Sequence, residues 1–212
     1  MVQKEKPRRG RPRAYDPDTA LTQVMDVFWD AGYAATSLDD LSAATGMNRP
    51  SLYGAFGDKR AIYAKAIAHY RTNARAAMRE AFAYDRPFRD ALRSICEAAL
   101  SLYCSGAKRP RGCFVFSTAV TEAVGDADAR ATLADVVREI DRALEARIRF
   151  AKERGDLRDD AKPEALAKMA AALLSSLSIR SRAGVPRAEL DAIIDAGLDL
   201  ICGAAKSVRR RH

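Results

Sequence analysis

The sequence predicts an all-α protein, with an N-terminal three-helix domain that contains a helix-turn-helix, followed by a larger helical domain. Three observations support this fold class. Apolar residues recur at helical spacing from residue 17 to the last turns of the chain. Polar and apolar residues nowhere alternate for long enough to make a strand. A glycine, a proline or a capping residue separates each helical run from the next.

The first fifteen residues form a basic segment in a chain of 212 residues with a formal net charge of +8. We expect residues 1–15 to be a disordered arm, because they contain almost nothing apolar to bury. Arg9 and Arg11 lie in the run Arg9-Gly-Arg-Pro12, which resembles the core of an AT-hook, a segment that inserts arginines into an A·T-rich minor groove. A solubilising basic tail would have the same composition.

The first helix is expected to follow the N-cap Asp16 and to end at Gly32. The segment 36–56 then predicts two short helices with a tight turn between them. Ser37 is an N-cap with Asp40 at its capping-box position, and Gly46 allows the sharp turn. This is the layout of a helix-turn-helix, whose second helix can enter a DNA major groove. An ordinary helical hairpin would have the same caps.

A fourth helix is expected to begin after the turn at Gly57 and to run to about Tyr84. The boundary Asp85-Arg-Pro87 then divides the chain into a first domain over 16–63 and a second over 85–212. Apolar stripes predict the helices of the second domain over 88–104, 113–124, 126–154, 163–182 and 186–207.

The last two helices are apolar over more than one face, which a terminal helix pair in a monomer would not need. We expect the pair to meet a second copy of the chain as a four-helix bundle. The alternative is a pair buried wholly within its own domain. The expected interface residues are Leu166, Met169, Leu173, Leu177, Leu190, Ile194, Leu198 and Ile201.

One combined pattern spans about residues 16–63. Its parts are Phe28-Trp-Asp-Ala-Gly-Tyr33, Thr36-Ser-Leu-Asp-Asp-Leu41, Ala44-Thr-Gly-Met47, Ser51-Leu-Tyr-Gly-Ala-Phe-Gly-Asp-Lys59 and Ala61-Ile-Tyr63. With this pattern, the N-terminal domain resembles the DNA-binding domain of the TetR family of bacterial transcriptional regulators. The resemblance implies an all-helical homodimer that binds a double-stranded DNA operator, and whose second domain binds a small effector that weakens DNA binding.

The resemblance also implies which residues contact DNA. Thr36, Tyr53 and Lys59 would contact phosphates, and Thr45, Arg49, Pro50, Ser51 and Gly54 would face the groove. Many members of the family have small residues where Arg49 and Pro50 stand here. We expect Arg49 to read bases, because its guanidinium fork matches the O6 and N7 atoms of guanine. A phosphate contact or an exposed charge at the start of a helix is the alternative.

For the effector, the sequence offers only apolar candidates. An ordinary helical core would use the same residues, which are Phe88, Leu92, Cys96, Phe114, Phe116, Thr118 and Met169.

Enzymatic and membrane functions are not indicated. The two histidines, the irregular spacing of the four cysteines and the lack of a glycine-rich phosphate loop predict no catalytic site, no cofactor and no metal site. No apolar run approaches the roughly 18 residues that a membrane span needs, so we expect a cytoplasmic protein without a membrane partner.

We therefore expect a homodimeric repressor that a small effector releases from a near-palindromic operator. Two alternatives remain. In a redox-responsive regulator, Cys113 or Cys104 would react if the basic loop 105–112 lowered the pKa of an exposed thiol, whereas buried thiols would be inert. An architectural DNA-binding protein would rely on the basic arm.

Overall fold

The computed structural model describes residues 15–106 and 109–203, and every regular element within these ranges is an α-helix, as the sequence predicts. Arg9 and Arg11 lie outside the described residues. None of the helices described is long and apolar enough to cross a membrane. The helices are α1 (Pro17–Ala31), α2 (Leu38–Thr45), α3 (Arg49–Phe56), α4 (Lys59–Met78), α5 (Phe88–Tyr103), α6 (Phe114–Glu122), α7 (Ala127–Glu153), α8 (Pro163–Arg182) and α9 (Arg187–Cys202).

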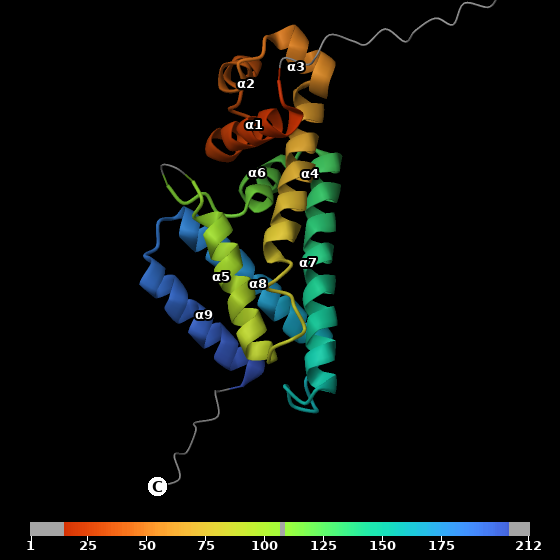
Figure 1. Ribbon diagram of the computed structural model, residues 1–212, viewed down its shortest axis with the longest axis vertical. Helices are drawn as coiled ribbons and strands as arrows, with labels where there is room; N and C mark the ends of the chain where they lie inside the picture. The colour runs from red at the N-terminus through yellow and green to blue at the C-terminus, as the bar shows by residue number, and fades with distance from the viewer. Residues whose placement is uncertain (1–14, 107–108, 204–212) are drawn as a thin grey trace, which may run out of the picture.

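Helices α1–α3 form a small unit at one end of an elongated molecule (Figure 1). The capping box predicted at the start of α2 is present: the backbone N–H of Ser37 donates to Asp40 at 2.8 Å, and the backbone N–H of Asp40 donates to the Ser37 hydroxyl at 3.1 Å. Gly46 takes the left-handed conformation, with φ of +66°, in the turn before α3. The buried side chain of Met47 completes the core between the two helices.

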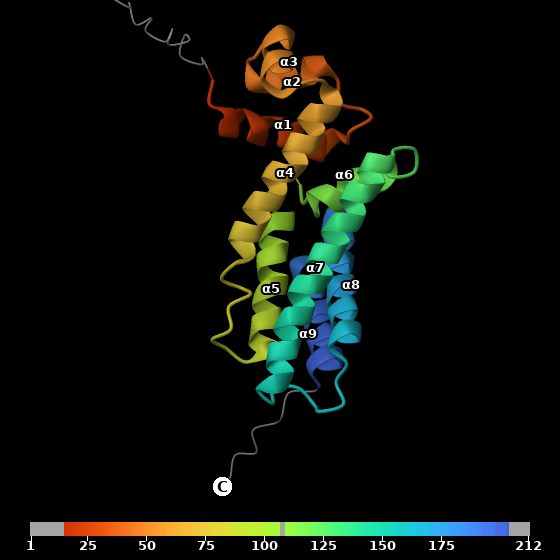
Figure 2. The ribbon, with the colours of Figure 1, turned by 90° about the vertical axis from the view of Figure 1, so that its right-hand side faces the viewer.

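Helix α4 connects this unit to the rest of the molecule. It runs from this unit toward the bundle of α5, α7, α8 and α9 at the far end, where it packs against α5 (Figures 1 and 2). Helix α6 crosses between the two parts and packs against α1, α4, α7 and α8. Helix α4 therefore belongs to both parts of the protein.

The prediction that α4 runs to about Tyr84 is wrong, because the helix ends at Met78. Two guanidinium groups of α7 bind carbonyl oxygens of the segment that follows. Arg147 donates to the carbonyl oxygen of Arg86 at 2.8 Å, and Arg154 donates to that of Tyr84 at 3.0 Å. These tertiary hydrogen bonds tie the non-helical segment after α4 to the C-terminal part of α7.

Candidate nucleic-acid interface and effector cavity

The exposed face of α3 carries most of the residues that were predicted to face the groove. The opposite face of the helix buries Leu52 and Phe56 in the core of the small unit. Asn48 caps the helix by accepting a hydrogen bond from the backbone N–H of Ser51 at 2.9 Å. The residues on the exposed face are Arg49, Pro50, Ser51, Tyr53 and Gly54.

Arg49 is exposed, but its guanidinium group is already paired. Its Nε atom donates to Oδ1 of Asp39 at 2.8 Å, and its Nη2 atom donates to the other carboxylate oxygen. This pair uses the Nε hydrogen and one Nη2 hydrogen, so the Nη1 group and the second Nη2 hydrogen are left to meet a guanine edge while Asp39 orients the side chain. The sequence did not predict this pair.

Two threonines predicted to contact DNA have structural partners in the chain. Thr36 is buried and its hydroxyl donates to the carbonyl oxygen of Gly32 at 2.7 Å. The structure therefore does not support a phosphate contact by the Thr36 hydroxyl. Thr45 is half-buried, and its hydroxyl donates to the carbonyl oxygen of Leu41 at 2.8 Å. This geometry assigns both hydroxyls to holding the turns around α2.

Lys59, predicted to contact a phosphate, begins α4 just after α3. Its Nζ atom lies 4.5 Å from the centre of the Tyr33 ring and 3.5 Å from the carbonyl oxygen of Ala34. The lysine is half-buried, so its stem is held against the small unit while the ammonium group remains near the surface.

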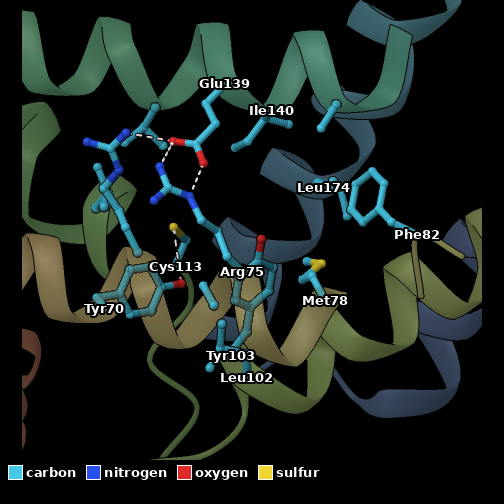
Figure 3. A pocket seen from close by; sticks show the side chains of 15 residues that line it. Tyr70, Arg75, Met78, Phe82, Leu102, Tyr103, Cys113, Glu139, Ile140 and Leu174 are labelled. Carbon is cyan, nitrogen blue, oxygen red and sulfur yellow. Dashed lines mark hydrogen bonds and ion pairs between the residues drawn. The ribbon is translucent and has the colours of Figure 1, made fainter. Parts of the chain in front are cut away.

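The second functional feature is a cavity of about 280 Å³ between α4, α5, α7 and α8 (Figure 3). Its wall is largely apolar and its lining residues come from segments far apart in the sequence. They are Tyr70, Arg71, Ala74, Arg75, Met78, Phe82, Leu102, Tyr103, Cys113, Val115, Val136, Glu139, Ile140, Ala143 and Leu174.

None of the seven residues predicted to line an effector pocket lines this cavity. Five of them, Phe88, Leu92, Cys96, Phe114 and Thr118, are buried in the helical core, which is the alternative that the sequence left open. Phe116 is half-buried and packs against the core, and Met169 is 56% exposed. Helical spacing placed these residues on the apolar faces of their helices, but it did not distinguish a core position from a cavity wall.

The residues predicted at the dimer interface are likewise partly exposed and partly buried in the core. Leu166 and Leu173 are half-buried, and Met169 is exposed. The remaining five are buried within the single chain, where they cannot contact another copy. They are Leu177, Leu190, Ile194, Leu198 and Ile201.

Cys113 does not have the environment on which the redox alternative depends. Cys113 is buried in the cavity wall, and burial raises the pKa of its thiol, the opposite of the effect expected from the basic loop. The Tyr70 hydroxyl donates to its sulfur at 3.5 Å. Cys104 is exposed, and neither cysteine forms a disulfide.

An aromatic cluster lies between the cavity and the small unit. The Trp29 ring of α1 packs against Tyr70 at 5.2 Å and against Phe114 at 5.5 Å, measured between ring centroids. The Arg111 guanidinium lies 4.3 Å from the centre of the Trp29 ring, and its Nη1 atom is 2.7 Å from Oδ1 of Asp26. Tyr70 belongs both to this cluster and to the cavity wall, so the two sites share a side chain.

Two family models match this architecture. The model described as "Bacterial regulatory proteins, tetR family" matches residues 21–66, which include α2 and α3. The model described as "Tetracyclin repressor-like, C-terminal domain" matches residues 89–196, half of the chain. The chain belongs to the TetR family. It is a DNA-binding transcriptional regulator.

Similar proteins share nearly the whole TetR-family architecture. The "HTH-type transcriptional repressor ComR" of Escherichia coli (strain K12) is 30% identical over 194 residues, 91% of each chain. The uncharacterized regulator YezE of Bacillus subtilis (strain 168) is 24% identical over 91% of this chain and 99% of its own. A cysteine mutant of the TetR-family regulator CifR, solved with 26-base-pair operator DNA, is 35% identical, with a TM-score of 0.78, over 89% of this chain and 98% of its own.

The cavity of this TetR-family protein is what the sequence did not reveal. Arg71 and Arg75 are one helical turn apart on α4, but their shared partner, Glu139, lies more than 60 residues away on α7. The spacing of the two arginines was visible in the sequence, whereas the carboxylate between them depends on how α4 and α7 pack.

Proposed function

We propose that the protein is a homodimeric repressor that binds a near-palindromic operator through two copies of α3 and leaves it when a small effector fills the cavity. The observation that carries the proposal is the position of α4. Only Gly57 and Asp58 separate it from the recognition helix, and its other half lines the cavity with Tyr70, Arg71 and Arg75. A ligand that displaces α4 would therefore move α3.

The operator partner is supported by the exposed face of α3 and by the relatives. ComR is named as a repressor, and CifR was solved with operator DNA. We propose the domain division 16–63 and 85–212, with α4 as the link and residues 1–15 as a basic arm. Because its relatives are bacterial DNA-binding regulators, we propose that the protein acts in the cytoplasm.

The proposed dimer surface is the outer face of α8 and α9. One row of residues on α8 advances by alternating steps of four and three, which is the spacing of a helix-packing seam. Its members are Ala165, Met169, Ala172, Ser176 and Ile179. Ile179 is 68% exposed, which is unusual for an isoleucine in a single chain. On α9, the exposed residues Ala188, Ala192, Ala196 and Leu200 follow at steps of four. Small side chains beside a few large ones allow two helix pairs to approach closely.

Replacing Ile179 by glutamate should weaken the dimer at least tenfold, because both copies would bury an unpaired carboxylate in the interface. Sedimentation velocity over a concentration series measures the dissociation constant. Val137→Glu, at an exposed position on α7 away from this face, is the matched control and should leave the dimer intact. Equal dimerisation of both variants would place the interface elsewhere.

Release from DNA is proposed to pass through the aromatic cluster and α4. Tyr70 contacts both the cavity and Trp29, and Arg111 ties the segment before Cys113 to Asp26 of α1. At the other side of the junction, Arg60 of α4 pairs with Asp126 at 2.9 Å. An effector shifts the protein away from DNA only by its higher affinity for the released arrangement of these contacts.

The proposal is tested by selecting binding sites from genomic fragments with the purified full-length protein and then mapping the protected bases. We expect two inverted half-sites about one DNA turn, roughly 10 base pairs, apart. Affinity should fall steeply with salt, because each neutralised phosphate adds about 0.9 to the logarithmic slope. Binding without any sequence preference would contradict the proposal and favour the architectural alternative.

A further inference from the structure

The mouth of the cavity carries two positively charged side chains and one negatively charged side chain. Two guanidinium groups of α4 share one carboxylate of α7: Arg71 Nη2 lies 2.6 Å and Arg75 Nη2 lies 2.7 Å from Oε2 of Glu139. Their hydrogen bonds, first that of Arg75, lower the pKa of Glu139 to about 2. The carboxylate is therefore ionised at neutral pH, and the three groups together carry one positive charge (Figure 3).

This charged group lies at the solvent side of an apolar space. The side chains of Arg75 and Glu139 are 58% and 34% exposed, whereas Tyr103, Val136 and Leu174 deeper in the wall are buried. A ligand that enters would thus place an apolar body among buried side chains while its end remains beside the arginines. The volume of about 280 Å³ suits a small molecule.

Hydrogen-bond donors remain unused at this cavity. The Nε atom of Arg71 is buried and has no partner among the described residues. No hydrogen bond of the Tyr103 hydroxyl occurs within the described part of the chain, although burial raises the pKa of this phenol well above its usual value and keeps it protonated. A buried donor is costly to leave unpaired, so the Nε atom of Arg71 favours a ligand that supplies an acceptor.

We propose that the effector is an amphipathic monoanion, an apolar body with a carboxylate head group that binds Arg71 and Arg75. This inference rests on the proposed function, since it names the chemical class of ligand for the same cavity. A carboxylate matches the guanidinium fork in charge and geometry, and the net positive charge at the mouth disfavours a cation. The ligand's head group competes with Glu139 for the two arginines, which loosens the tie between α4 and α7.

The test uses three probes with the same eight-carbon tail and different head groups: octanoate, 1-octanol and octylammonium. Trp29, the single tryptophan of the chain, packs against Tyr70 of the cavity wall, so its fluorescence reports occupation, with calorimetry as the second measurement. We expect octanoate to bind the full-length protein at least tenfold more tightly than octanol, and octylammonium to bind most weakly. If octanoate fails to bind, or binds no better than octanol, the proposal is wrong.

Variants of α4 locate the head group. Arg75→Gln should remove most of the advantage of octanoate over octanol without changing octanol binding, and Arg75→Lys should keep much of it. Arg79→Gln, an exposed position just past α4 that does not line the cavity, should leave all three affinities unchanged. If Arg75→Gln leaves the preference for octanoate intact, the assignment of the head group is overturned. Should that variant fail to fold, the head-group series on the natural protein decides.

This test needs no DNA. A failure to find a sequence-specific operator would overturn the proposed function while leaving the head-group preference measurable. The reverse result, specific DNA binding without a preference for octanoate, would overturn only the class of ligand.

Discussion

Replacing Trp29 by alanine should lower the free energy of unfolding by about 3–5 kcal/mol, the range for truncating a large aromatic side chain in a core. The side chain is 1% exposed and contacts Tyr70, Phe114 and the Arg111 guanidinium. Alanine would leave a void at the junction between α1 and the rest of the bundle. Urea unfolding followed by far-ultraviolet circular dichroism measures the change without needing the tryptophan signal.

The comparison variants separate packing from other effects. Trp29→Phe should cost much less, because the indole N–H has no partner among the described residues and only ring volume is lost. Val124→Ala, at a position that is 82% exposed, should change stability by no more than about 0.5 kcal/mol. A loss below about 1 kcal/mol for Trp29→Ala would mean that the junction contributes little to folding, and the proposed route from cavity to DNA would lose its support.

The second large effect concerns base reading by Arg49. Arg49→Ala should remove the preference for one base in each half-site, at a cost of about 1–3 kcal/mol for the preferred operator and little for operators altered at that position. The physical reason is that a bidentate guanidinium discriminates guanine from other bases, whereas a phosphate contact does not. Fluorescence anisotropy with a panel of operators, each altered at one position, measures the differences.

Asp39 and Lys59 supply the matched variants for this experiment. Asp39→Asn should strengthen binding to all operators, because it removes a negative charge that lies beside Arg49 on the DNA-binding side. Lys59→Gln should weaken all operators about equally and reduce the salt dependence, as expected for a phosphate contact. If Arg49→Ala also weakens every operator equally, then Arg49 contacts only phosphate and another residue of α3 reads the bases.

Local signals predicted the helices well where the deciding interactions lie within a few residues. The caps Ser37 and Asn48 act on the next turn, and Pro163 and Arg182 bound α8 as predicted. The local pattern did not predict the end of α4 at Met78, nor the hydrogen bonds that Arg147 and Arg154, far along the chain, donate to the carbonyl oxygens of Arg86 and Tyr84. A capping pattern carries no information about such partners.

The candidate sites were predictable to very different degrees. The helix-turn-helix pattern predicted α3 itself, and its exposed residues include those for which the resemblance to the TetR family implies a place in the groove. The pocket residues did not, because Phe88 and Leu92 are as apolar as Val136 and Leu174, which do line the cavity. A packed core and a cavity wall use the same apolar residue types, so the sequence alone does not separate them.

By itself, the sequence determined the all-α class, the helix-turn-helix and the family of the protein, because periodicity, caps and turn glycines act over one or two helical turns. Only the tertiary structure decided where the cavity lies, that Arg71 and Arg75 share Glu139, and that Asp39 holds Arg49. It also showed that α9 turns Leu190 and Ile194 inward and leaves Leu200 exposed. Periodicity states which faces of a helix are apolar, but the packing of distant helices decides what covers each face.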